Sequence, residues 1–380
     1  KWNNILGWAV FGIALVTYLS TIEHKFSFWD TGEYISSAVK LEVTHAPGAA
    51  LFQLVGAVAA ILSFGNEAYY SLIINAMSAL FSAFTILFLF WTITHLVRRI
   101  LNKEMEELSS AEMISVLFSG VIGSLAFTFS DTFWYSAVEG EVYSMASMFI
   151  ALVVWLITKW ENEYHDSDSQ RWIILIFFIV GLSVGVHMMV MLAVPAVCFI
   201  YYARNYKFTW KNFIIANFIT LGVLAFVFKG IFPIVMRLFG KSEIFFVNSI
   251  GLPFLSGTII AFIILVAFCY YIIRYTRKTK NHLYQTAALS VVYMIIGFSC
   301  WMMIPIRANA NPPMNLNNPD TAIGMLDYYN REQYGDWPTI YGQNYTAHLD
   351  AHGIERNEDG GYKTIKTGDV YEKNKKTGKY

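Results

Sequence analysis

Charged residues are scarce in this sequence of 380 residues, because Asp, Glu, Lys and Arg together make up only 14% of it. A soluble domain typically carries about a quarter of such residues, so this composition argues against an ordinary water-exposed surface. Hydrophobic residues reach 56%, and lipid is therefore the expected solvent for most of the chain. The formal net charge is zero, which argues against binding of nucleic acid.

Cysteine is also scarce, and its placement argues against two kinds of site. The three cysteines, Cys198, Cys269 and Cys300, all lie within apolar runs, and no two of them form a CxxC pair. The sequence therefore predicts neither a thiol redox motif nor a thiolate metal site. Buried cysteines that behave as small hydrophobic side chains are expected instead.

Long apolar runs are the main feature that is present. A helix of about 20 apolar residues crosses the hydrocarbon core of a bilayer. The runs lie near Ile5–Ile22, Ala68–Val97, Met113–Phe129, Val142–Ile157, Trp172–Val186, Met188–Tyr202, Phe213–Phe228, Pro253–Ile273 and Tyr284–Ile304. They predict an all-α, polytopic transmembrane helical bundle with about nine spans. The glycines between Gly181 and Gly185 favour a break between the fifth and sixth runs.

The distribution of Lys and Arg predicts the orientation of the bundle. The basic clusters 98–103, 204–211 and 274–280 fall on the same side as Lys1 only if the short apolar segment 49–64 does not cross. We therefore expect a cytoplasmic N-terminus, an outer loop at 23–67, and a short interfacial helix at 49–64 within it. Residues 131–140, 185–187 and 229–252 are then expected to be outer connections.

The composition changes near residue 307 and predicts two regions. Residues 1–306 are expected to form the transmembrane module. Residues 307–380 are poor in aliphatic side chains and cannot bury a core of their own. They are expected to be a periplasmic loop or the start of an outer domain.

Ionisable side chains gather on the predicted outer side, beginning with Asp30 and Glu33. Two carboxylates three residues apart share a face if they begin a helix. They would either cap that helix or, beside lipid and aromatic walls that raise a carboxylate pKa, serve as a general base. His45 precedes a rigid Pro47-Gly48 turn. Its ring has either a structural role or donates a hydrogen bond to a phosphate.

Further outer residues extend this set. Glu139 and Glu141 precede a span and are either water-facing caps or functional, and His187 is either hydrogen-bonded within the bundle or part of a site. Arg307 would either snorkel to the surface or bind a phosphate. Lys229 and Arg237 offer the same chemistry. Acids together with an outer arginine suggest a base for an acceptor hydroxyl and a phosphate clamp.

Five motifs, in order along most of the chain, carry a resemblance to a known family. They are Trp29–Glu33, His45–Gly48, Glu139–Tyr143, Gly181–His187 and Arg331–Pro338. With these motifs the sequence resembles the GT-C superfamily of membrane glycosyltransferases, and more closely the protein O-mannosyltransferase-like family. Ala46 stands where that family is expected to have proline.

The resemblance implies a GT-C fold and an enzyme of the bacterial inner membrane whose active site faces the periplasm. The enzyme would move a sugar from a polyprenyl-phosphate donor to an acceptor hydroxyl, most plausibly a protein Ser or Thr. In this reading Asp30 is the catalytic base and Glu33 assists or orients the acceptor. The donor phosphate is held by Arg307 with His45 or His187, and the acceptor or site-lining residues are Trp29, Glu139, Glu141 and Tyr143.

The sequence leaves the metal and the acceptor open. Oxygen atoms of Asp30, Glu33, Glu139 and Glu141 would suit a hard divalent cation. A glycolipid or envelope polymer is an alternative acceptor. A non-enzymatic transporter or assembly subunit is the alternative from another class, but a transporter places ionisable groups near the bilayer midplane in repeated halves. The ionisable residues of this sequence are instead predicted to cluster at the outer membrane face, which favours the enzyme over the transporter.

Overall fold

The computed structural model describes residues 1–166, 168–335 and 370–380, and every regular element in these ranges is helical, which confirms the predicted all-α class. The first half of the chain forms α1 (Trp2–Ser20), α2 (Thr31–Lys40), α3 (Ala50–Ala60), α4 (Tyr70–Leu101), α5 (Ser110–Thr128), α6 (Asp131–Ala137), α7 (Val142–Asn162) and α8 (Gln170–Ser183). The second half forms α9 (Val194–Asn205), α10 (Trp210–Ala225), α11 (Phe232–Ile244), α12 (Ser256–Thr279), α13 (His282–Phe298), α14 (Met303–Asn309) and α15 (Ala322–Asn330).

Within the described ranges, eight helical stretches are long and apolar enough to cross a membrane. They are Trp2–Ser20, Glu67–Leu101, Ser110–Thr128, Val142–Asn162, Met188–Asn205, Trp210–Ser249, Ser256–Thr279 and His282–Asn309. The remaining predicted span, near Trp172–Val186, corresponds to α8, whose 14 residues fall short of the about 20 that a straight crossing needs. The predicted break is present, because α8 ends at Ser183 and a new helical stretch begins at Met188. The chain is a multi-pass membrane protein.

The prediction of an outer connection at 229–252 is wrong for most of that segment. Helix α10 continues through a π-helical turn at Phe226–Ile231 into α11, and a second π-helical turn follows at Phe245–Ser249. The isolated charges of Lys229, Arg237 and Lys241 suggested a loop. They are spaced among apolar residues that pack on α12 and α15, and this packing keeps the segment helical.

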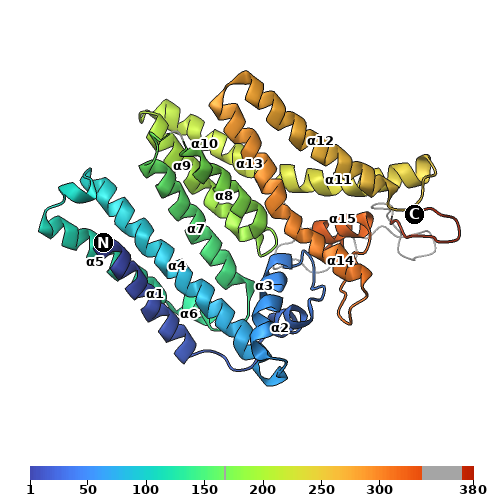
Figure 1. The fold of residues 1–380 in the computed structure, drawn as a ribbon, viewed down its shortest axis with the longest axis horizontal. Helices are drawn as coiled ribbons and strands as arrows, with labels where there is room; N and C mark the ends of the chain where they lie inside the picture. Colours follow the sequence, from blue (N-terminus) through green and yellow to red (C-terminus); the bar gives the residue numbers. More distant parts are fainter. Residues whose placement is uncertain (167, 336–369) are drawn as a thin grey trace, which may run out of the picture.

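The connections between helices gather at two ends of the bundle, as the distribution of basic residues predicted (Figure 1). The turns that join α4 to α5, α9 to α10 and α12 to α13 carry the basic clusters and lie along one edge, which we call the basic end. Helices α2, α3, α6 and α14 lie at the opposite end (Figure 1). We call it the site end, because it carries the predicted site residues of the outer loops.

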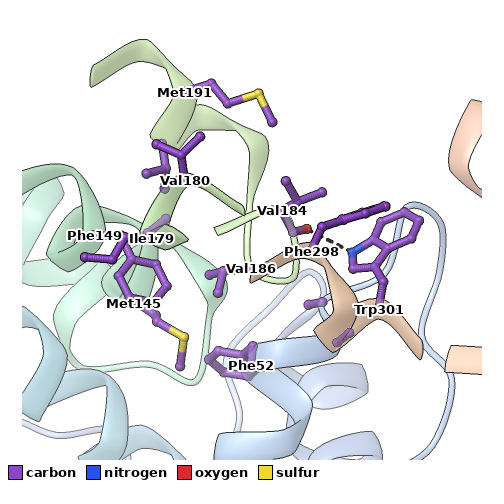
Figure 2. Packing of buried hydrophobic residues seen from close by; sticks show 14 of the residues in the cluster. Phe52, Met145, Phe149, Ile179, Val180, Val184, Val186, Met191, Phe298 and Trp301 are labelled. Carbon is purple, nitrogen blue, oxygen red and sulfur yellow. Dashed lines mark hydrogen bonds between the residues drawn. The ribbon is translucent and has the colours of Figure 1, made fainter. Parts of the chain in front are cut away.

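The main hydrophobic core lies directly behind the site end. Figure 2 shows Phe52 from α3, Met145 and Phe149 from α7, and Val184 and Val186 from the turn after α8. The Trp301 indole donates a hydrogen bond to the Val184 carbonyl at 3.1 Å. This bond ties the end of α8 to the start of α14 and so supports the turn that presents His187.

Two glycines allow α8 and α13 to pack at very short range. A Cβ atom built on Gly181 would lie 2.1 Å from the Met294 carbonyl oxygen, and one on Gly297 would lie 2.3 Å from the Phe178 carbonyl oxygen. Small residues at such positions let helix backbones approach closely in membranes. Gly181 therefore lies inside α8 and serves its packing, while the break itself begins after Ser183.

Candidate active site

The first outer loop folds into two short helices, as predicted for an interfacial element at 49–64. Helix α2 begins after Asp30, which is its N-cap residue, and carries Glu33 in its first turn. Helix α3 and the 3-10 turn Ile61–Ser63 cover the predicted interfacial segment. Asp30 makes no side-chain capping hydrogen bond, so its carboxylate is not committed to the helix end.

His45 lies between Asp30 and Glu33. Its Nδ1 atom is 3.1 Å from Oε1 of Glu33, and its main-chain N–H donates to the same oxygen at 2.7 Å. Its Nε2 atom is 3.8 Å from Oδ2 of Asp30. The side chain of Asp30 is 53% exposed, whereas those of Glu33 and His45 are 21% and 28% exposed. Asp30 is therefore the carboxylate of this trio that faces solvent most openly.

Electrostatics in the trio favour a charged pair behind Asp30. The hydrogen bond to Glu33 raises the pKa of His45 above its ordinary value, against the opposing effect of burial, and the charges of Glu33 and Asp30 add to the increase. Burial raises the pKa of Glu33, but the hydrogen bonds from the His45 ring and main chain outweigh it, so the pKa lies below its ordinary value. The pair therefore favours the protonated ring of His45 beside Asp30.

A distant part of the chain fixes the loop that carries His45. The hydroxyl of Tyr328, in α15, donates to the carbonyl oxygens of Thr44 and His45. Gly48 has φ +77°, and a Cβ atom there would lie 2.7 Å from the Tyr328 hydroxyl oxygen. Glycine is thus required on both backbone and steric grounds, and the described part of region 307–380 completes the site rather than lying apart from it.

Glu139 and Glu141 are buried, with exposed fractions of 7% and 6%. Glu141 caps α7 by accepting from the Val142 N–H, and Thr31 donates to it at 3.5 Å. Burial raises the pKa of Glu141 to about 7, and the nearby charges of Asp30 and Glu139 contribute. Burial also raises the pKa of Glu139. The alternative of water-facing caps is therefore wrong, although capping by Glu141 is real.

His187 faces Tyr143 and lies near a cation that the sequence analysis assigned no role. Its ring centroid is 5.4 Å from that of Tyr143. Its Nδ1 atom accepts from the Met189 N–H at 3.1 Å, so the neutral ring carries its proton on Nε2. Burial lowers the pKa of His187, and the positive charge of Arg331 lowers it further. The charge of Arg331 also lowers the pKa of His45, so Arg331 is a cation whose charge acts on both histidines.

Arg307 reaches the first outer loop through main-chain contacts. Its Nε donates to the Leu41 carbonyl at 2.6 Å, and a terminal nitrogen donates to the Lys40 carbonyl at 3.3 Å. These carbonyls close the C-terminal end of α2, where a cation is favourable. The observed contacts give Arg307 a role in holding α2, and the cation whose charge acts on the two histidines is Arg331.

Trp29 lies at the exposed edge of the site, next to Asp30 in the chain. It has φ +62° and is 93% exposed, and the neighbouring Phe28 is 87% exposed. Aromatic side chains at the end of a span commonly lie at the membrane surface. These two exposed rings directly precede Asp30 in the chain.

Three groups at the site have the spacing of a cation-binding set. One ligand atom each from Asp30, Glu33 and His45 lies within 4.8 Å of the others. The sequence analysis proposed Asp30, Glu33, Glu139 and Glu141 for this purpose, and the observed set contains the first two with His45 in place of Glu139 and Glu141. The observed donors combine two carboxylates with an imidazole, a set that fits a divalent cation.

Sequence reasoning missed Tyr328 and gave Arg331 no role. Arg331 is the first residue of the motif Arg331–Pro338. The last three residues of that motif, 336–338, lie outside the described residues. That motif was the available signal for Arg331. No local pattern indicates that Tyr328 contacts a loop 284 residues earlier in the chain.

The fold and these residues define a class of protein: a polytopic helical membrane protein with a carboxylate and histidine site at one end. Comparison with known proteins narrows the class. A family model described as the protein O-mannosyl-transferase TMEM260 N-terminal domain matches residues 30–210. This match begins at Asp30 and includes Glu33, His45, Glu141 and His187.

Two curated relatives agree with the family model. The chain is 28% identical over 176 residues to protein O-mannosyl-transferase TMEM260 of Mus musculus. This alignment covers 46% of this chain and 22% of the relative. The chain is 24% identical over 215 residues to protein O-mannosyl-transferase tmem260 of Dictyostelium discoideum. This second alignment covers 54% of this chain and 24% of the relative. No solved structure matches. These matches support an O-mannosyltransferase-like family, as the motifs predicted, and they span about a quarter of each relative.

Proposed function

We propose that this chain is the membrane module of a glycosyltransferase that moves a sugar from a polyprenyl-phosphate donor to an acceptor hydroxyl. The names of the relatives support a mannosyl group and a protein acceptor. The observation that carries the proposal is the half-exposed carboxylate of Asp30 beside His45, in an otherwise buried acidic site at one end of the membrane helices. The fold is proposed to be of GT-C type, in a bacterial inner membrane, with the site end facing the periplasm.

Asp30 is the proposed general base. Its carboxylate accepts the proton of the acceptor hydroxyl as the oxygen attacks the anomeric carbon, and the bond to the donor phosphate breaks with inversion. Glu33 positions His45 through two hydrogen bonds, and His45 in turn positions Asp30. Glu33 is thereby proposed as a positioning residue, and Asp30 as the group that touches the reacting atoms.

The leaving phosphate requires a cation or hydrogen-bond donors. We assign this role to Arg331 together with the Nε2–H of His187, because the positive charge of Arg331 acts on that ring. Guanidinium groups suit phosphate oxygens. Arg307 supports this arrangement by holding the end of α2. A divalent cation held by Asp30, Glu33 and His45 would require the neutral His45 ring, and its charge would take the place of the imidazolium charge.

The test is replacement of Asp30 by Asn in the full chain. Transfer from a polyprenyl-phosphate sugar is expected to fall by about 100-fold or more, as for loss of a general base. Asp131→Asn is the matched control, because Asp131 is an exposed carboxylate in the first turn of α6, at the same end. Incorporation by Asp30→Asn at the wild-type rate would refute the assignment. Mass spectrometry of the products decides between a protein acceptor and a glycolipid or envelope polymer.

A further inference from the structure

A polar cavity lies at the basic end of the bundle, at the opposite end from the carboxylates of the candidate active site. Its volume is about 800 Å³, within the range of roughly 300–1,000 Å³ typical of small-molecule sites. Its walls come mainly from α1, α4, α7 and the end of α9. The residues used below are Trp8, Arg98, Arg99, Lys159, Glu161 and Arg204. The proposed transfer reaction uses none of them.

Two of the three carboxylates that line this cavity are already engaged with cations. Glu161 accepts from the ring of His95 at 2.7 Å and pairs with Arg99 at 2.9 Å. Arg98 pairs with Glu104. Glu104, Glu161, Arg98 and Arg99 all line the cavity, and the charges of these two carboxylates and two guanidinium groups balance. The third lining carboxylate, Glu106, is exposed.

Two further cations have no carboxylate partner among the described residues. The Lys159 ammonium lies 5.2 Å from the Trp155 ring centroid. The Arg204 guanidinium lies 4.7 Å from the Tyr164 ring centroid, and one terminal nitrogen is 3.1 Å from the ring of His165. The Nε atom of Arg204 is buried without a hydrogen-bond partner in the described part of the chain. Aromatic faces hold both cations, and the Lys159 ammonium and the terminal guanidinium nitrogens of Arg204, rather than its buried Nε, are left to meet an anion.

The surface beside the cavity indicates the source of that anion. On α1, Trp2, Ile5 and Trp8 are 64%, 44% and 51% exposed, and Trp8 also lines the cavity. These residues lie on a helix apolar enough to cross the membrane, so their exposed sides face lipid at the basic end. A ligand with a phosphate and acyl chains would place the phosphate in the cavity and the chains along α1.

We infer that this cavity binds the phosphate of an anionic phospholipid from the leaflet at the basic end, with Lys159 and Arg204 as its donors. Basic pockets between membrane helices at the cytoplasmic side commonly hold such headgroups. Arginine supplies a planar pair of donors, and lysine supplies a compact charge. The lipid would join α1, α4, α7 and α9, which contribute separate walls.

The experiment compares two charge-matched double variants of the full chain. Lys159→Gln with Arg204→Gln removes the two cavity cations, while Arg277→Gln with Lys278→Gln removes two exposed cations near the end of α12, at the same end of the bundle. Native mass spectrometry of delipidated protein measures binding of phosphatidylglycerol and of phosphatidylcholine. Thermal unfolding in phosphatidylcholine confirms that each variant is folded.

The wild-type chain and the α12 variant are expected to prefer phosphatidylglycerol, and the cavity variant is expected to bind it at least about tenfold more weakly. Equal weakening in both variants would overturn the inference, because a general surface attraction would then explain it. Absence of a preference for phosphatidylglycerol in the wild type would also overturn it. If inorganic phosphate alone raises the unfolding temperature as much as phosphatidylglycerol does, the ligand is a soluble phosphate and the lipid assignment is wrong.

Discussion

At the scale of single residues, the site divides its acidic groups by exposure. Asp30 is half-exposed, Glu33 is held by His45, and Glu141 is buried beneath them. This gradient assigns different chemistry to residues of the same type. A carboxylate near solvent can meet an acceptor hydroxyl, one bound to an imidazole positions that ring, and a buried one retains its proton to higher pH.

The burial of Glu141 predicts how stability depends on pH. The folded protein holds this proton up to about pH 7, whereas the ordinary pKa of the group is 4.5. The folded state binds more protons between these values, so this group lowers stability as pH rises through them.

Glu141→Gln removes that loss. The unfolding temperature of Glu141→Gln minus that of the wild type is expected to increase between about pH 5 and about pH 8. The corresponding change in the free energy of unfolding is up to about 3 kcal/mol. Thermal unfolding at both pH values measures the difference. Glu67→Gln, at an exposed site-end position, controls for the loss of a carboxylate. A difference between Glu141→Gln and wild type that does not change with pH would contradict the burial of a protonated Glu141.

At the scale of elements, contact between α8 and α13 sets the position of the turn that carries His187. The close approach depends on Gly181 and Gly297, and the Trp301 bond to Val184 lies just beyond it. A change in this helix pair would therefore move the donor side of the site as well as reduce stability.

Gly181→Ala is expected to destabilise the protein by about 1–3 kcal/mol, because its Cβ atom meets the Met294 carbonyl and the helices must separate. Gly222→Ala in α10 is the matched control, since nothing lies within 4 Å of the Cβ atom there. Both changes gain helix propensity equally, so the difference in unfolding temperature isolates packing. Equal stability of the two variants would mean that α8 and α13 are not in close contact.

At the scale of the whole molecule, the two ends of the bundle carry different chemistry. The turns that carry the basic clusters gather at one end (Figure 1), and the carboxylate and histidine trio Asp30, Glu33 and His45 lies at the other. This separation follows from the positive-inside rule if the protein sits in a membrane with the basic end in the cytoplasm.

Cysteine labelling tests the separation. With Cys198, Cys269 and Cys300 replaced by Ala, single cysteines at Glu67 and Glu106 report on the two ends, since both positions are exposed. A membrane-impermeant maleimide is expected to label Glu67→Cys from outside intact cells and Glu106→Cys only after the membrane is opened. Labelling of both positions from the same side would contradict the proposed topology.

Sequence reasoning located the elements better than it located their contacts. Asp30, Glu33 and His45 were predicted on one face and do lie together, because all three belong to one short loop after a span. The segment 229–252 was misjudged, since scattered charges in a helix and in a loop look alike without knowledge of what the apolar residues pack against.

The sequence by itself determined that the chain crosses a membrane many times, and it predicted which ends of the helices gather together. Apolar runs and basic clusters act locally, through transfer to lipid and through charge. Only the tertiary structure decided that Tyr328 fixes the His45 loop, that Arg307 holds α2, and that the charge of Arg331 acts on the two histidines. The contacts of Tyr328 and Arg307 join residues more than 260 positions apart, and their formation depends on how the helices pack rather than on any local pattern.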